Sequence, residues 1–173
     1  MAIRRDSNVT VDRLDQKILD SLYRDGRITK TKMSEEVGLS ATRCWERMQK
    51  LERGGIIRGY HADIDLRRLA KLSLYQVQVS LSNPSSAKAQ QFERFVTRID
   101  EIISCHAVLG TVDYLMLVAA PDTETFQAIM EDISSRETIG FDYITYPIAK
   151  TVKSAHAVSL LSLIAIAHAE PED

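Results

Sequence analysis

A short helix, a glycine and a longer helix follow one another between residues 29 and 54, and this pattern most restricts the possible fold. Thr29 can cap the first helix, Gly38 can adopt the left-handed backbone that ends it, and Ser40 can cap the second helix. An upstream segment, 12–24, has apolar residues at four-residue spacing and predicts a third helix that packs against this pair. The sequence therefore predicts a helix-turn-helix unit.

The longer helix, 41–53, is predicted to bury one side and expose a polar one. Its apolar side consists of Cys44, Met48 and Leu51. Polar side chains can meet base edges in a DNA groove, and cations can meet phosphates. A merely solvated helix would look similar, but the position within the helix-turn-helix favours DNA. The predicted DNA-binding residues are Ser40, Thr42, Arg43, Glu46, Gln49, Lys50 and Arg53.

Two side chains of this helix lie on the flank of the apolar side. We expect Trp45 to pack against the neighbouring helix or the following segment rather than to face DNA. We expect Arg47 to be half-buried and to pair with a carboxylate such as Asp15 or Glu36. Neither residue is predicted to read bases.

The charge is distributed unevenly along the chain. Residues 1–68 carry 15 lysines and arginines against 11 aspartates and glutamates, whereas residues 69–173 carry 7 against 13. A basic first part suits phosphates, and an acidic second part is repelled by them. Chance could produce the same split, but it agrees with one DNA-binding part and one part with another role.

The second half changes to an alternating strand and helix pattern. Strands are predicted at 73–81, 102–109, 114–120 and 141–153, with helices after Ser85 and after Asp122 and a hairpin loop at 110–113. This βαββαβ order predicts an α+β fold, in which the helix-turn-helix unit is followed by a ferredoxin-like sandwich. The predicted domains are 1–58, a connector at 59–72, and a second domain at 73–173.

The motifs of catalysis and metal binding are missing from the sequence. Cys44 and Cys105 are 61 positions apart and the four histidines are scattered, so neither a zinc cluster nor a redox motif can be written. We therefore expect no enzyme, no metal and no cofactor. We expect a cytoplasmic protein, because the start of the chain lacks an apolar signal and the apolar segment 155–169 is shorter than the ~20 residues that span a bilayer.

Several ordered segments follow the pattern of one family. They are 11–19, 25–28, 37–40 and 55–60 in the first half, and 101–114, 145–146 and 152–153 in the second. The chain thereby closely resembles the Lrp/AsnC family, the leucine-responsive or feast/famine regulators, over about residues 11–153. The resemblance implies a bacterial or archaeal transcription regulator that binds double-stranded DNA through a winged helix-turn-helix. It implies that the domain at 73–173 binds an effector and forms the oligomer. It also implies homodimers that assemble into octamers, and a small amino acid or derivative as effector.

The resemblance places the effector at the hairpin loop 110–113, between the strands predicted at 102–109 and 114–120. Asp113 can meet an ammonium group, and the backbone amides around it can meet a carboxylate. The alternative is that Asp113 only stabilises the turn. The predicted effector-binding residues are Gly110, Thr111, Val112, Asp113, Tyr114 and, on the last strand, Thr145.

A second function class stays open at this point. A ligand-sensing or architectural module without control of a specific promoter would explain the second half of the chain equally well. Specific binding to the promoter of its own gene separates the two.

Overall fold

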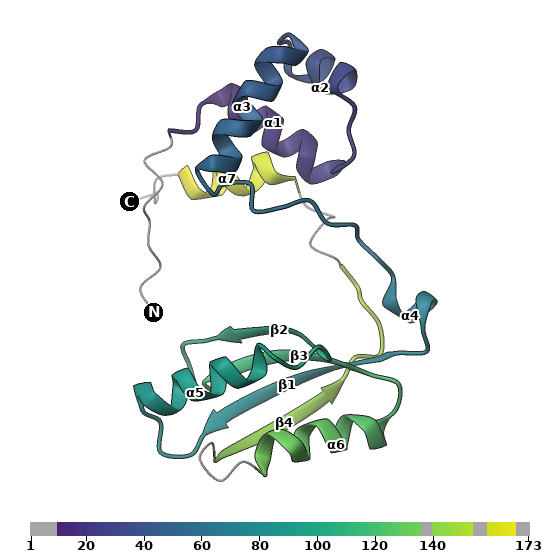
Figure 1. Ribbon diagram of the computed structural model, residues 1–173, viewed down its shortest axis with the longest axis vertical. Helices are drawn as coiled ribbons and strands as arrows, with labels where there is room; N and C mark the ends of the chain where they lie inside the picture. Colours follow the sequence, from purple (N-terminus) through teal and green to yellow (C-terminus); the bar gives the residue numbers. More distant parts are fainter. Residues whose placement is uncertain (1–9, 136–139, 154–158, 169–173) are drawn as a thin grey trace. The chain divides into compact units, whose positions relative to one another are not determined.

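The computed structural model describes residues 10–135, 140–153 and 159–168. The chain forms two compact units, which we call the helical unit and the sheet unit. The helical unit comprises the chain up to Asp63 together with the segment from Val152 onward, and the sheet unit comprises Ile64–Thr151. Figure 1 shows the helices and strands that make up each unit.

Three capped helices form the first part of the helical unit, α1 (Arg13–Arg24), α2 (Lys30–Val37) and α3 (Ala41–Arg53). The side chain of Asp12 accepts from backbone amides at the start of α1, and Thr29 and Ser40 do the same for α2 and α3. Gly38 has φ of +78°, a left-handed conformation that favours glycine. The predicted helix-turn-helix is confirmed, because α2 ends at this glycine and α3 begins two residues later.

The core of the helical unit is small and apolar. Its fully buried members are Ile18, Met33, Val37, Cys44 and Leu51. They come from all three helices, so the four-residue spacing in the sequence does mark the packed sides.

The segment after α3 differs from expectation. Gly54 caps α3 and Gly55 takes a left-handed φ of +69°, and residues 56–65 are assigned no strand. Tyr60 is tied back to α3, since its hydroxyl donates to Glu52 at 2.8 Å. The predicted connector contains a short helix, α4 (Leu66–Leu69), that the sequence analysis missed. With four residues it has too few positions to show a helical period.

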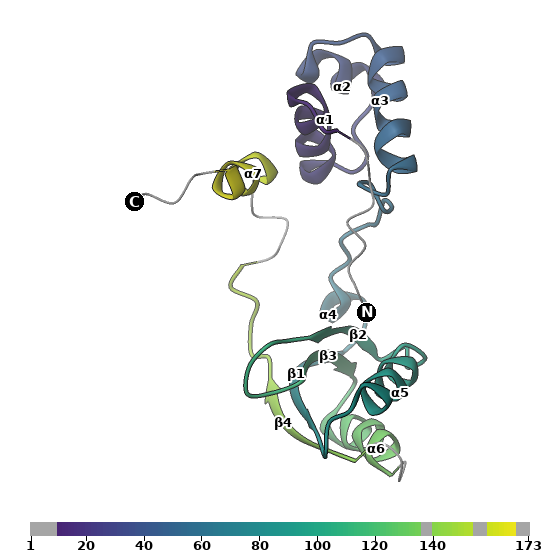
Figure 2. The same cartoon turned by 90° about the vertical axis from the view of Figure 1, so that its left-hand side faces the viewer.

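The sheet unit follows the predicted βαββαβ order. Its elements are β1 (Ser73–Leu81), α5 (Ser86–Val96), β2 (Ile102–Ala107), β3 (Tyr114–Ala120), α6 (Thr123–Ser134) and β4 (Phe141–Pro147). The strands are antiparallel in the order β2-β3-β1-β4. Figure 2 shows both helices on one face of the sheet. The ferredoxin-like sandwich is therefore confirmed.

Alternate residues of β1 point into the core beneath these helices. Tyr75, Val77, Val79 and Leu81 are buried, and Phe92 of α5 packs against the same core with no exposed surface. The intervening residues of β1 face the side of the sheet opposite α5 and α6, and they are half-buried from Leu74 onward. The period of two in the sequence thus separates the two faces.

Two strands are shorter than predicted. β2 ends at Ala107 rather than at residue 109, because the amide of Val108 already donates to the carbonyl of Asp113 and closes the hairpin. β4 ends at Pro147 rather than at residue 153. Proline has no N–H to continue a ladder, and its partner Tyr75 lies close to the start of β1.

The last helix, α7 (Leu160–His168), belongs to the helical unit, although the predicted domain 73–173 would place it with the sheet. It packs on α1, where Asp20 is only 7% exposed. One carboxylate oxygen of Asp20 accepts from the amide of Leu161 at 3.3 Å, and the other from Arg24 at 3.1 Å. Asp20 therefore caps α7 from another helix. None of the described helices is long and apolar enough to cross a membrane.

We expect Asp20→Ala to lower the stability of the helical unit by about 1 kcal/mol, the usual cost of a lost cap. The cost should shrink in a chain ended after Lys153, which has no α7 to cap. Thermal unfolding is measured for the full chain and for the shortened chain, each with and without Asp20→Ala. The four values give the coupling between Asp20 and α7 directly. An equal cost of Asp20→Ala with and without α7 would contradict the capping role.

Candidate nucleic-acid interface and effector site

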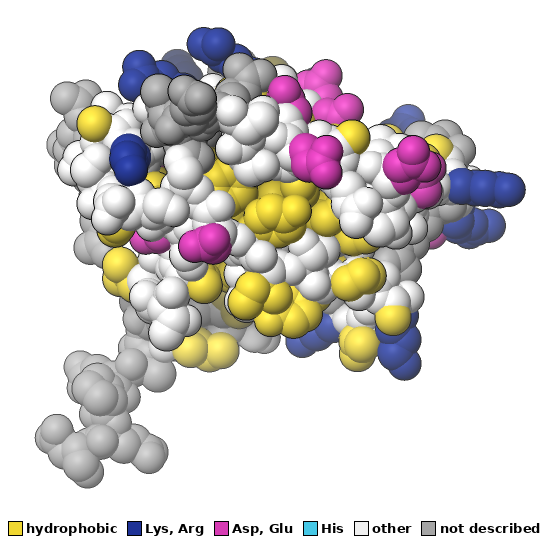
Figure 3. All heavy atoms as spheres, turned by 90° about the horizontal axis from the view of Figure 1, so that it is seen from below, with side chains coloured by type: hydrophobic (Ala, Val, Ile, Leu, Met, Phe, Trp, Pro, Cys, Tyr) yellow, Lys and Arg dark blue, Asp and Glu magenta, His cyan; other side chains and the backbone are white. Residues whose placement is uncertain are grey.

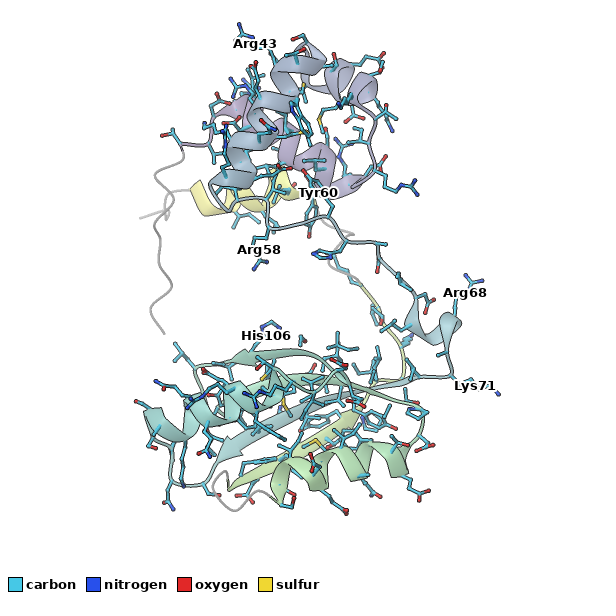
Figure 4. All side chains as sticks on the ribbon, viewed as in Figure 1. Arg43, Arg58, Tyr60, Arg68, Lys71 and His106 are labelled. Carbon is cyan, nitrogen blue, oxygen red and sulfur yellow. The ribbon has the colours of Figure 1, made fainter. Side chains whose placement is uncertain are left out.

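Five of the predicted DNA-binding residues on α3 and its cap are exposed to solvent. They are Ser40, Thr42, Arg43, Glu46 and Arg53, and Gln49 is half-buried. The hydroxyl of Ser40 also accepts from the amide of Arg43 at 3.3 Å, so it has a structural role as the cap. Arg43 points away from the helical unit (Figure 4). The N-terminal half of α3 is thus free to meet a partner.

The two predicted phosphate contacts already have local partners. The ammonium of Lys50 donates to the carbonyl of Thr10 at 2.7 Å and lies 3.4 Å from Asp15. The guanidinium of Arg53 donates to the carbonyl of Gln49 at 3.3 Å. To contact a phosphate, each side chain would have to divide its donors between the phosphate and its present partner. Lys50 keeps 44% of its side chain exposed.

A buried ion pair joins α3 to α1. Arg47 donates to Asp15 at 2.7 Å and to Asp12 at 2.7 Å, and the Asp15 side chain has no exposed surface. The backbone amide of Asp15, followed by Arg47, lowers the pKa of Asp12 below its ordinary value. The predicted pairing of Arg47 with Asp15 is confirmed. Arg47 therefore orients the recognition helix rather than facing outward.

Trp45 is more exposed than the sequence analysis expected. Its side chain is 43% exposed on α3, and the ammonium of Lys30 in α2 lies 5.0 Å from the ring centroid. It touches the neighbouring helix, as predicted, without being buried by it. A lysine in the first turn of the preceding helix is the signal in the sequence that could have indicated this pair.

The hairpin of the sheet unit is closed by Asp113. Its carboxylate accepts from the amide of Leu81 at 2.7 Å, and its own amide donates to the carbonyl of Val79 at 2.9 Å. Asp113 thus stabilises the end of β1, the role given above as the alternative. The bond to Leu81 uses one carboxylate oxygen, Oδ2.

A cavity of about 460 Å³ lies beside this carboxylate. It is lined by Leu81, Pro84, Ser85, Ser86, Ala89, Ala107, Val108, Asp113 and Tyr114. Ser85 is the cap of α5, so the positive end of a helix dipole and the carboxylate of Asp113 line one cavity. Such a cavity offers opposite charges to a molecule that has both an ammonium and a carboxylate.

Only two of the predicted effector residues line this cavity. Gly110, Thr111 and Val112 are in the hairpin loop, but not among the lining residues. Thr145 lies on β4 opposite Val77, with β1 and β3 between it and β2. Among the described residues its hydroxyl is a buried polar group without a hydrogen-bond partner.

Burial raises the pKa values of two side chains of the sheet unit, Tyr114 and Cys105. The hydroxyl of Tyr114 donates to Glu93 at 3.2 Å, and burial with this carboxylate raises the pKa of Tyr114 to about 12. Burial raises the pKa of Cys105 to about 11, so its thiol stays protonated at neutral pH. His106 is exposed on β2 (Figure 4). Within the described ranges no group of three or more His, Cys, Asp or Glu could hold a metal ion.

Comparison with known proteins agrees with this division into two units. A family model described as winged helix-turn-helix DNA-binding matches residues 11–58, and one described as the Lrp/AsnC ligand binding domain matches residues 75–158. The chain belongs to the Lrp/AsnC family. Among Lrp/AsnC relatives, the transcriptional regulatory protein DoeX of Halomonas elongata is 39% identical over 85% of this chain and 93% of that protein. The leucine-responsive regulatory protein of Escherichia coli is 35% identical over 84% of this chain and 89% of that protein.

Solved structures of Lrp/AsnC regulators share the fold. An AsnC family transcriptional regulator from Agrobacterium tumefaciens has a TM-score of 0.74 at 29% identity and covers 83% of this chain and 93% of its own. A transcriptional regulator from Neisseria meningitidis in an L-Met complex has a TM-score of 0.79 at 28% identity and covers 89% of this chain and 99% of its own. The chain is thus a transcriptional regulator of this type, with a ligand-binding domain.

Proposed function

We propose that the protein binds a specific promoter sequence through the exposed side of α3 and that a small amino acid or a close derivative changes this binding. The observation that carries the proposal is the capped helix-turn-helix with Thr42, Arg43 and Glu46 exposed on one side of its second helix. This set combines hydrogen-bonding groups for base edges with a cation, as major-groove readout requires.

Arg43→Ala tests the DNA readout. If Arg43 contacts a base, its loss costs about 1–3 kcal/mol of binding to the cognate duplex and relaxes the preference for that base pair. Electrophoretic shifts with the duplex upstream of its own gene, and with single-base variants of it, measure both effects. A variant with Thr42, Arg43, Glu46 and Gln49 all changed to Ala that keeps its sequence preference would overturn the assignment.

A homodimer, or a larger even-numbered assembly such as an octamer, is part of the proposal. One short recognition helix reads too few bases for a genomic site, whereas two helices related by a two-fold axis reach half-sites about 34 Å apart or a multiple of it. Exposed apolar side chains on β4, among them Ile144 and Tyr146, support an assembly in which another subunit covers them. Figure 3 shows hydrophobic side chains gathered near the centre of the face that it draws.

For the effector we propose the cavity beside Asp113. An amino acid would place its carboxylate at the start of α5 and its ammonium at the carboxylate of Asp113. The L-Met complex of the Neisseria meningitidis regulator supports this ligand class. Gly110, Thr111 and Val112 would contribute only if the loop closes over the ligand, and Thr145 would have to act from another strand.

Asp113→Asn tests the effector site better than Asp113→Ala. The amide oxygen of asparagine can still accept from Leu81, so the turn is retained while the negative charge is lost. The ligand for this test is the amino acid that raises the thermal midpoint of the native protein. We expect the Asp113→Asn protein to lose binding to this amino acid, and we expect its DNA binding without ligand to be unchanged. If calorimetry shows that the Asp113→Asn protein binds that amino acid with unchanged affinity, the ligand binds elsewhere.

The proposal also includes that the protein acts by binding alone, without a catalytic step. A ligand-sensing or architectural module without promoter control is the second candidate. It predicts that affinity for the upstream duplex equals affinity for unrelated duplex DNA.

A further inference from the structure

Trp45, the only tryptophan of the sequence, lies on the flank of the exposed side of α3. Its side chain is 43% exposed. A large aromatic ring left in water forgoes the favourable burial that such rings usually provide. A partner surface that covers α3 would recover this burial.

The ammonium group of Lys30 lies over the Trp45 ring. Lys30 is the first residue of α2, and its ammonium lies 5.0 Å from the centroid of the Trp45 ring. A cation over the face of an indole is attracted by the ring quadrupole. The pair therefore joins the start of α2 to α3 and places one positive charge beside the predicted DNA-binding face.

The charges of α2 are reversed relative to its dipole, which is an observation independent of Trp45. Its first turn contains Lys30 and Lys32 and no acidic residue, and its last turn contains no basic one. Lysines at the positive end of a helix are unfavourable in an isolated protein. An anion bound there is attracted both by the lysines and by the positive end of the helix dipole. The arrangement therefore fits a polyanion on this side of the helical unit.

We propose that Trp45 and Lys30 form one edge of the DNA-contact surface. Lys30 contacts a backbone phosphate, and the ring of Trp45 covers the adjoining deoxyribose. The proposal rests on the proposed DNA-binding function and adds to it two residues outside the predicted set. Because the pair meets the sugar–phosphate backbone, it contributes affinity without contributing sequence preference.

Intrinsic fluorescence tests the position of Trp45 in the unmodified full-length protein. Since the sequence has one tryptophan, all tryptophan emission comes from this ring. We expect acrylamide to quench the free protein readily and the complex with the duplex upstream of its own gene much less. Equal quenching with and without saturating duplex would overturn the assignment of Trp45.

Salt dependence tests Lys30. We expect Lys30→Gln to weaken binding to cognate and unrelated duplexes by the same factor and to reduce the slope of log affinity against log salt by about one. Trp45→Leu should weaken both by the same factor at an unchanged thermal midpoint. Lys71→Gln, an equal loss of charge at an exposed lysine of the sheet unit, should leave affinity and slope as they are (Figure 4).

The outcomes separate the pair from the proposed function. A native protein that binds no duplex at low salt overturns both. Native binding with sequence preference, together with an unchanged slope in Lys30→Gln, overturns only the pair and leaves recognition to the other residues of α3.

Discussion

Arg47→Ala is expected to unfold the helical unit under conditions in which the native protein is folded. The change removes the partner that lies 2.7 Å from a carboxylate with no exposed surface, that of Asp15. Breaking a buried ion pair from one side costs about 3–5 kcal/mol, because the remaining charge stays buried without compensation. Lys50, at 3.4 Å, offsets only part of this cost. Thermal unfolding by circular dichroism measures the loss, and DNA binding should disappear with the fold.

Arg43→Ala is the matched control for this variant. It is the same change on the same helix, but Arg43 is exposed and its side chain points to solvent. Its stability should stay within about 0.5 kcal/mol of the native value, as usual for surface substitutions. In an Asp15→Asn background, Arg47→Ala should cost less than it does alone, because no buried charge remains. Equal costs in both backgrounds would show that the pair with Asp15 contributes nothing to the stabilisation by Arg47.

Phe92→Ala is expected to have a comparable effect on the sheet unit. Phe92 is fully buried between α5 and the sheet, with its ring centroid 4.6 Å from that of Tyr114 and 5.8 Å from that of Phe141. Replacing a buried phenylalanine by alanine costs about 3–5 kcal/mol through lost burial and the cavity left behind. Because Tyr114 lines the cavity proposed for the effector, ligand binding should weaken as well.

Phe92→Leu separates packing from chemistry, since it keeps most of the buried volume and should cost clearly less than alanine. Scanning calorimetry of all these variants can assign the two transitions. We expect Phe92→Ala to shift only the transition of the sheet unit. We expect Arg47→Ala to shift only the transition of the helical unit. One common transition that moves equally in both variants would mean that the two units do not unfold separately.

Caps and periodicity made most of the fold predictable. Asp12, Thr29, Ser40, Ser85 and Asp122 all cap the helices that the sequence analysis assigned to them, because a side-chain acceptor followed by a helical pattern is a local signal. The period of two in β1 predicted the core face in the same way.

What could not be predicted depends on contacts between distant residues. The docking of α7 on α1 requires Asp20 and Leu161 to meet, and nothing near either residue indicates this. The bond from Leu81 to Asp113 likewise joins two strands. The same holds for the effector site, where only Asp113 and Tyr114 of the six predicted residues line the cavity, since the other walls come from α5 and its cap.

The docking of α7 also determines when the helical unit can be completed during synthesis. Asp20 and Leu161 are 141 positions apart, so the ribosome releases α7 long after α1 has formed. The sheet shortens this loop, because Tyr75 lies opposite Pro147 and joins the two ends of the intervening chain. With that shortcut the loop to be closed falls to roughly 70 residues, about half, and each halving lowers the closure cost by about 0.6 kcal/mol. A nascent chain should therefore dock α7 last, and any change that frays the pairing of β1 with β4 should also loosen α7, which belongs to the other unit.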